Sequence, residues 1–103
     1  MTTADQLLTA TRTEHDLLGD LAVPQVAYYG VHTVRAVENF PITGITLQMC
    51  PIFIGALAAV KQAAATANRD IGALDPAKAD AIIAATNDIR SGRLHEQFIV
   101  DMI

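Results

Sequence analysis

The sequence of 103 residues contains one cysteine, no tryptophan, and only two tyrosines and three phenylalanines. The single cysteine, Cys50, cannot form an internal disulfide bond, and no cysteine and histidine residues have the spacing of metal ligands. The scarcity of cysteine therefore excludes a disulfide framework and predicts no metal site. A reduced thiol is typical of the cytoplasm, so we expect a cytoplasmic protein.

Basic side chains are also scarce, since seven Lys and Arg residues stand against eleven Asp and Glu residues, giving a net charge of −4. A chain of this sign lacks the positive surface that nucleic acids require, and it is disfavoured at anionic membranes. Residues 41–60 are uncharged, but polar residues and Pro51 interrupt them, which indicates a buried segment rather than a membrane span. The N-terminal residues also lack the pattern of a secretory signal. We expect neither nucleic acid nor a membrane as a partner.

The chain is long enough for one domain, and its character changes near residue 50. Before that point, Gly and Pro residues punctuate short apolar stretches, which predicts a mostly extended first half. Within it, Thr13–Leu18 and Leu21–Val23 are predicted to form a small β-hairpin whose turn is the pair Gly19 and Asp20, typical of type II′. Residues 1–12 are expected to be flexible, with one or two helical turns over Thr3–Ala10.

After residue 50 the apolar residues follow a helical period. A first helix is predicted to begin at Pro51 and to end at Gly72, where a left-handed cap fits. Its expected packing face repeats every three or four residues. The members of this face are Phe53, Leu57, Val60, Ala64, Ala67 and Ile71. Ala56, Ala59 and Ala63 flank it, so we expect a second helix to approach closely and the first to be sandwiched.

A second helix has clear signals at both ends. Asp75 is predicted to cap it, Pro76 provides a preset backbone angle at its first position, and Gly92 ends it. Its apolar face is predicted to consist of Ala79, Ile82, Ile83, Thr86 and Ile89. The polar residues Asp80, Asn87, Asp88 and Arg90 are expected to form a solvated face. The sequence therefore predicts a mainly α fold, with an extended N-terminal segment and hairpin followed by an antiparallel helix pair.

The stretch YYGVHTVRAVENF at residues 28–40 holds the richest set of polar side chains. In an extended conformation, Val31, Thr33 and Arg35 face one way, while His32 and Val34 face the other. Arg35 offers a planar fork of donors suited to a carboxylate, so the stretch is a candidate anion-binding site. The alternative is structural, with an ion pair between Arg35 and Glu38 and a turn over residues 39–41.

Other candidate motifs favour structural roles. The chain has no Gly-rich phosphate loop and no G-x-S-x-G elbow, which excludes the common nucleophile enzymes. His15 and Asp16 are predicted to be exposed on an edge strand. His95 and Glu96 follow a helix end, where a histidine commonly contacts terminal carbonyl groups. The apolar ending FIVDMI is unusual for a domain end, so we expect the chain to be cut after Ile103.

Six segments in the same order together resemble the first part of the aspartate ammonia-lyase family. They span most of residues 13–103, and the family subunit is much longer. The segments are EHDLLGD (14–20), VP (23–24), AYYGVHTVRAVENFPITG (27–44), VKQAAATANRDIG (60–72), AIIAATNDI (81–89) and QFIVD (97–101). The resemblance identifies the chain as the N-terminal domain of an aspartase-like lyase.

The resemblance implies an enzyme that eliminates ammonia from L-aspartate to give fumarate, with no cofactor. It implies a homotetramer whose sites combine residues of several subunits. The family's catalytic serine and its Gly-rich carboxylate-binding turn lie downstream of these residues, so we expect no catalytic residue in this chain and no activity from it alone. The residues that carry over as substrate-binding candidates are His32, Thr33, Arg35 and Asn39.

Two alternatives stay open. Fumarases resemble the same region, with Trp, Ala and Gln where this chain has Tyr29, Val31 and His32. A fumarase-like hydratase is therefore the first alternative. The second is a noncatalytic helical interaction module that keeps the family's scaffold.

Overall fold

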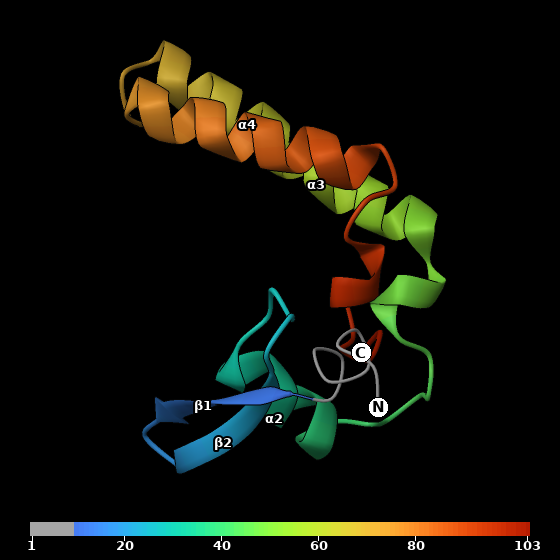
Figure 1. The fold of residues 1–103 in the computed structure, drawn as a ribbon. Helices are drawn as coiled ribbons and strands as arrows, with labels where there is room; N and C mark the ends of the chain where they lie inside the picture. The colour runs from blue at the N-terminus through green and yellow to red at the C-terminus, as the bar shows by residue number, and fades with distance from the viewer. Residues whose placement is uncertain (1–9) are drawn as a thin grey trace. The chain divides into compact units, whose positions relative to one another are not determined.

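The structure is a computed structural model that describes residues 10–103, in two compact units. In the described chain, the first unit contains residues 10–45 and 99–103, and the second contains residues 46–98. Figure 1 shows a hairpin and a short helix early in the chain and a pair of long helices later. The helical turns expected over Thr3–Ala10 fall almost entirely outside the described residues.

The first unit begins with an antiparallel hairpin of β1 (Thr11–Asp16) and β2 (Gly19–Pro24). Thr11 and Arg12, assigned to a flexible end from sequence, therefore lie in a strand. The hairpin is confirmed, but its predicted turn is wrong by two residues, because Asp16 pairs with Gly19 and the turn passes through residues 17 and 18. The Asp16 carboxylate accepts a hydrogen bond from the Leu18 N–H at 2.9 Å. Such side-chain bonds stabilise turns, and Gly19 supplies the positive φ of +114° that follows.

Helix α2 (Val31–Asn39) replaces the extended conformation predicted for residues 28–40. The carboxylate of Glu14, on β1, accepts a hydrogen bond from the Val31 N–H at 2.8 Å, and so satisfies a donor of the first helical turn. Val31 is buried, while Val34 and Arg35, three and four residues on, are half-buried. The segment therefore follows a helical period, and reading it with a period of two was wrong.

The last residues of the chain complete the first unit. The Asp101 carboxylate accepts hydrogen bonds from the backbone N–H groups of Thr43 and Gly44, at 2.9 and 3.0 Å, and from the Thr43 hydroxyl. The Met102 N–H donates to the Ile45 carbonyl at 2.9 Å. A single carboxylate thus fastens residues 43–45 to the chain end.

The second unit contains α3 (Pro51–Asp70) and α4 (Pro76–Arg90), which lie side by side as the predicted antiparallel pair (Figure 1). Two short 3-10 helices, η1 (Leu47–Met49) and η2 (His95–Gln97), flank them. The predicted end signals are confirmed. Gly72 has a φ of +79°, and the Asp75 carboxylate accepts a hydrogen bond from the Lys78 N–H at 3.2 Å. In the described part of the chain, no helix has the length and apolar character needed to cross a membrane.

The packed face of α3 differs from the predicted one. The buried residues are Ile54, Ala58 and Ala65, whereas Val60 is 68% exposed. The predicted face lies about one residue further around the helix and faces solvent. On α4 the prediction holds better, because Ala79 and Thr86 are buried. Side-chain size explains which face of α3 is buried. The small side chains of Ala58 and Ala65 let α4 approach α3 closely on that face. The residues predicted for that role, Ala56, Ala59 and Ala63, do not form this buried face.

Candidate functional site

A cleft in the first unit, with a volume of about 440 Å³, lies between the hairpin turn and α2. It contains three of the four predicted substrate-binding residues. Its lining residues are Asp16, Leu17, Leu18, His32, Arg35, Ala36, Asn39 and Phe40. The helix explains the grouping, because positions 32, 35 and 39 are spaced by three and four residues and share one face. Thr33 also lies on α2 but does not line the cleft, and it is half-buried.

Arg35 is held by Asp16 in a two-point ion pair. Its Nε and Nη2 atoms donate to the two carboxylate oxygens at 2.7 and 2.9 Å, and Nη2 also donates to the Gly19 carbonyl at 3.1 Å. The Asp16 side chain is only 8% exposed, so its predicted exposure was wrong. The predicted pairing of Arg35 with Glu38 is replaced by this contact. Because the guanidinium is already paired with a carboxylate, it presents little net charge to a ligand.

The ion pair sets the charge state of Asp16. Hydrogen bonds from Arg35 lower the pKa of the Asp16 carboxyl, burial opposes that shift, and the Leu18 N–H adds to it. The same contact raises the pKa of Arg35. Both groups are therefore charged throughout the neutral pH range.

His32 and Asn39 are the cleft residues most available to a ligand. The His32 side chain is 87% exposed, and its Nδ1 atom lies 3.8 Å from Asp16 Oδ2, too far for a hydrogen bond. Asn39 is exposed at the last position of α2. An imidazole and an amide can each donate or accept a hydrogen bond. Together they offer hydrogen-bonding partners beside an arginine that is already paired with a carboxylate.

Arg12 supports the segment that leads into α2, although it was predicted to lie in a flexible N-terminal end. Its guanidinium donates to four backbone carbonyl oxygens at 2.8 to 3.1 Å. These carbonyl groups belong to Pro24, Gln25, Ala27 and Tyr29. Its Nε atom also donates to the Glu14 carboxylate at 2.7 Å. The pKa of Glu14 is lowered by this bond and by the bond from the Val31 N–H.

A sequence signal for this network exists. Arg12, Glu14 and Asp16 occupy alternate positions of β1, so their side chains share one face of the hairpin. All three are half-buried, while the residues between them are exposed. Alternating charges in a strand thus marked an inward face, whereas Asp16 was predicted to be exposed on an edge strand.

The remaining histidine predictions agree with the structure. His15 is exposed and lies 2.8 Å from the Asp20 carboxylate. His95 Nε2 lies 2.9 Å from the carbonyl oxygen of Ile89, in the last turn of α4, as expected for a histidine after a helix end. Among residues 10–103, no group of three or more His, Cys, Asp or Glu side chains could hold a metal ion.

The sequence of this chain is similar to those of known lyases. The lyase family matches residues 19–103. The aspartate ammonia-lyase of Pseudomonas aeruginosa is 52% identical over 94 residues, which cover 91% of this chain and 20% of that protein. The class II fumarate hydratase of Halobacterium salinarum is 50% identical over 91 residues, covering 88% of this chain and 19% of that protein. The chain thus spans about a fifth of the length of these relatives.

Solved structures share the fold. The fumarate lyase:delta crystallin of Brucella melitensis, in its native form, matches with a TM-score of 0.78 and 49% identity, over 89% of this chain and 21% of that chain. The class II fumarase of Schistosoma mansoni matches with a TM-score of 0.75 and 29% identity, over 88% of this chain and 19% of that chain. The hairpin followed by a helix pair therefore belongs to a fold that several lyases share.

Proposed function

Because the chain belongs to the lyase family, we propose that it forms the N-terminal domain of an aspartate ammonia-lyase, which converts L-aspartate to fumarate and ammonia. The observation that carries the proposal is the 52% identity to the aspartate ammonia-lyase of Pseudomonas aeruginosa. The full enzyme is proposed to be a cytoplasmic homotetramer. The chain alone is proposed to be inactive, because it resembles a part of the family that lacks the catalytic serine.

The cleft residues are proposed to assist substrate binding. Elimination removes a proton from C3 and breaks the C–N bond, so negative charge develops on the adjacent carboxylate and fixed donors there lower the barrier. His32 and Asn39 are suited to hydrogen-bond such an anion because both are exposed in the cleft. Arg35 is proposed to position α2 through Asp16. Thr33 stays a weaker candidate because it lies outside the cleft.

A second candidate function is hydration of fumarate. The 50% identity to the Halobacterium salinarum class II fumarate hydratase supports it. Both reactions have fumarate as a reactant or product, so a shared scaffold serves either. The two candidate reactions differ in the group that leaves or joins the carbon chain. An ammonia-lyase removes ammonia to form fumarate, whereas a hydratase adds water to fumarate.

Two chimeric enzymes test the proposal. In each, this chain replaces the matched region of a relative, either the Pseudomonas aeruginosa aspartate ammonia-lyase or the Halobacterium salinarum fumarate hydratase. The two parent enzymes are nearly equally identical to this chain, so each chimera is a control for the other. We expect the aspartate ammonia-lyase chimera to retain the larger share of its parent's kcat/KM, measured by fumarate absorbance. If both chimeras fold but only the fumarate hydratase chimera is active, the proposal is contradicted.

A further inference from the structure

The carboxylate of Glu14 connects β1 to the start of α2. Its Oε1 atom accepts a hydrogen bond from the Val31 N–H at 2.8 Å, and its Oε2 atom accepts one from Arg12 Nε at 2.7 Å. Gly30, the residue before the helix, has no side chain that could cap it. The first N–H groups of a helix have no partner within the helix, so the Val31 N–H needs an acceptor from elsewhere. Glu14 therefore acts as a helix cap from seventeen residues away.

The surroundings of Glu14 restrict the position of its carboxylate. A Cβ atom at position 30 would lie 2.8 Å from Glu14 Oε1, so the backbone approaches the carboxylate more closely than a residue with a side chain allows. On the other side, Arg12 is itself held by backbone carbonyl groups, including those of Pro24 and Tyr29. The side chains of Arg12 and Glu14 are 27% and 29% exposed. Charge-assisted contacts of fixed geometry thus define where α2 begins.

His32 follows Val31 directly, so the contact that fixes the first turn of α2 also fixes the backbone that carries the imidazole. Beyond the hydrogen bonds from Arg12 and from the Val31 N–H, a charge on His32 helps to lower the pKa of Glu14, which places the imidazole near that carboxylate. The His32 side chain lines the cleft and is largely exposed. Because an exposed side chain has little packing of its own, its position depends on the backbone beneath it.

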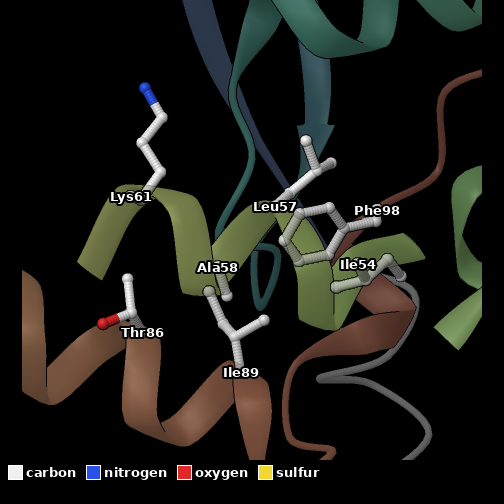
Figure 2. Close-up of a pocket in the computed structure, with 7 residues that line it drawn as sticks. All are labelled: Ile54, Leu57, Ala58, Lys61, Thr86, Ile89 and Phe98. Carbon is white, nitrogen blue, oxygen red and sulfur yellow. The ribbon is translucent and has the colours of Figure 1, made fainter. Parts of the chain in front are cut away.

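The second unit offers a contrast, an apolar cavity of about 230 Å³ lined by residues of α3 and α4 and by Phe98 (Figure 2). In Figure 2 the amino group of Lys61 points away from the other labelled side chains. The hydroxyl group of Thr86 donates to the Ile83 carbonyl. Neither polar group is therefore directed at a ligand. In the cleft of the first unit, by comparison, the helix that carries the polar side chains is held by charged contacts from β1.

We propose that Glu14 is a positioning residue of the lyase reaction, which acts by fixing the place of His32 in the cleft. This inference rests on the proposed function, because it takes His32 as a group that hydrogen-bonds the substrate anion. Neither Glu14 nor Arg12 lines the cleft, so Glu14 acts through His32 rather than by touching the substrate. A small movement is enough, because a displacement of about 1 Å can lower a rate by about a hundredfold.

A double-mutant cycle in the aspartate ammonia-lyase chimera tests the proposal, with kcat/KM measured by fumarate absorbance. Glu14→Gln keeps the size of the side chain but offers one acceptor oxygen to two donors, whereas Glu14→Asp keeps the charge and shortens the reach. We expect each to lower kcat/KM by about tenfold or more, and to have little further effect once His32→Ala is present. Glu38→Gln is the matched control, because Glu38 is exposed on α2 and does not line the cleft. It should leave kcat/KM unchanged.

A measurement without substrate separates this inference from the proposed function. In the chain alone, we expect Glu14→Gln and Glu14→Asp to shift the imidazole NMR signals of His32. The signals of His95, which lies in the second unit, should stay unchanged and serve as an internal control. Glu38→Gln should shift neither set of signals.

Three results would overturn the positioning role. Equal losses of kcat/KM with and without His32→Ala would show that Glu14 maintains the fold and does not act through the imidazole. Unchanged kcat/KM in the folded Glu14 variants would show that the reaction does not need the contact. Unchanged His32 signals would show that the imidazole does not depend on it. If only the fumarate hydratase chimera is active, the proposed function fails, and the same cycle in that chimera decides the positioning role separately.

Discussion

Asp16 and Arg35 connect two elements that are far apart in the sequence, since one ends β1 and the other is in the middle of α2. Their two hydrogen bonds have a fixed, planar geometry, which distinguishes them from an exposed pair held only by charge. His15 and Asp20 provide the contrast, because their side chains are 74% and 70% exposed. Exposed pairs contribute little to stability. The hairpin therefore depends on its inward-facing charges.

A double-mutant cycle tests this dependence. We expect Asp16→Ala and Arg35→Ala each to lower the thermal midpoint of the chain by several degrees, and the double variant to lower it little further, because either change breaks the same contact. Arg35→Lys should restore only part of the stability, since lysine cannot make the two-point contact. His15→Ala and Asp20→Ala form the control pair, with effects near zero. Additive losses from Asp16→Ala and Arg35→Ala would mean that the two side chains act separately.

Three carboxyl groups predict a stability that depends on acid pH. Hydrogen bonds from Arg12 and Arg35 lower the pKa values of Glu14 and Asp16 below their ordinary values of 4.5 and 3.8. Burial alone would raise the pKa of Asp101, but hydrogen bonds from Ile103, Thr43 and Gly44 outweigh it and lower the pKa.

For each group the unfolded chain binds the proton more tightly than the folded chain. The stabilisation is therefore complete above the ordinary values, and it is lost as the pH falls through the lowered ones. We expect the urea midpoint to be constant from pH 7 to about 5 and to fall steeply below about pH 4. Asp101→Asn should lower the midpoint at pH 7 and reduce its fall in acid. An unchanged midpoint down to pH 3 would contradict the assignment of these contacts.

At the scale of elements, local signals predicted α3, α4 and the hairpin, while distant contacts decided the rest. Asp75, Pro76 and Gly72 act within a few residues of the helix ends that they define, so sequence spacing is enough to find them. The start of α2 instead depends on Glu14, seventeen residues earlier. No local period contains that contact, and this is why residues 28–40 were predicted to be extended.

Gly30 tests this account of α2, and Gly55 in α3 provides the contrast. A Cβ atom on Gly30 would lie 2.8 Å from Glu14 Oε1, so Gly30→Ala should displace the carboxylate that caps α2. We expect lower helicity in circular dichroism and a lower thermal midpoint. Gly55, inside α3, has open space at its Cβ position, so Gly55→Ala should stabilise the chain by about 0.5 to 1 kcal/mol. Gly30→Ala with unchanged helicity would show that the start of α2 does not need Glu14.

The sequence singled out three residues that line the cleft, but it did not predict the geometry that brings them together. Arg35 lies in a polar cluster as predicted, yet its partner is Asp16, which was predicted to be exposed to solvent. The helical spacing of His32, Arg35 and Asn39 was present in the sequence, but it has meaning only once α2 is known to be a helix. The substrate-binding role of these residues stays a prediction.

At the scale of the whole molecule, the buried residues of the described chain form two small cores. Val23 and Val31 are buried in the first unit, and Ile54, Ala58, Ala65 and Ala79 are buried in the second. A small core removes little apolar area from water, so each unit has low stability of its own. Composition and length do not reveal how the buried residues divide, and the prediction of one domain stays a prediction.

The division predicts that a core substitution acts within its own unit. Ile54 is fully buried in the second unit, so Ile54→Ala should destabilise that unit by about 2 to 5 kcal/mol. Ile52, on the same helix, is 90% exposed, and Ile52→Ala should change stability by no more than about 0.5 kcal/mol.

Hydrogen exchange measured by mass spectrometry follows each unit separately. We expect Ile54→Ala to speed exchange in residues 46–98 and Asp16→Ala to speed it in residues 10–45, because each removes contacts inside one unit. If either substitution speeds exchange equally in both ranges, the chain unfolds as one cooperative body, and the two cores stabilise each other.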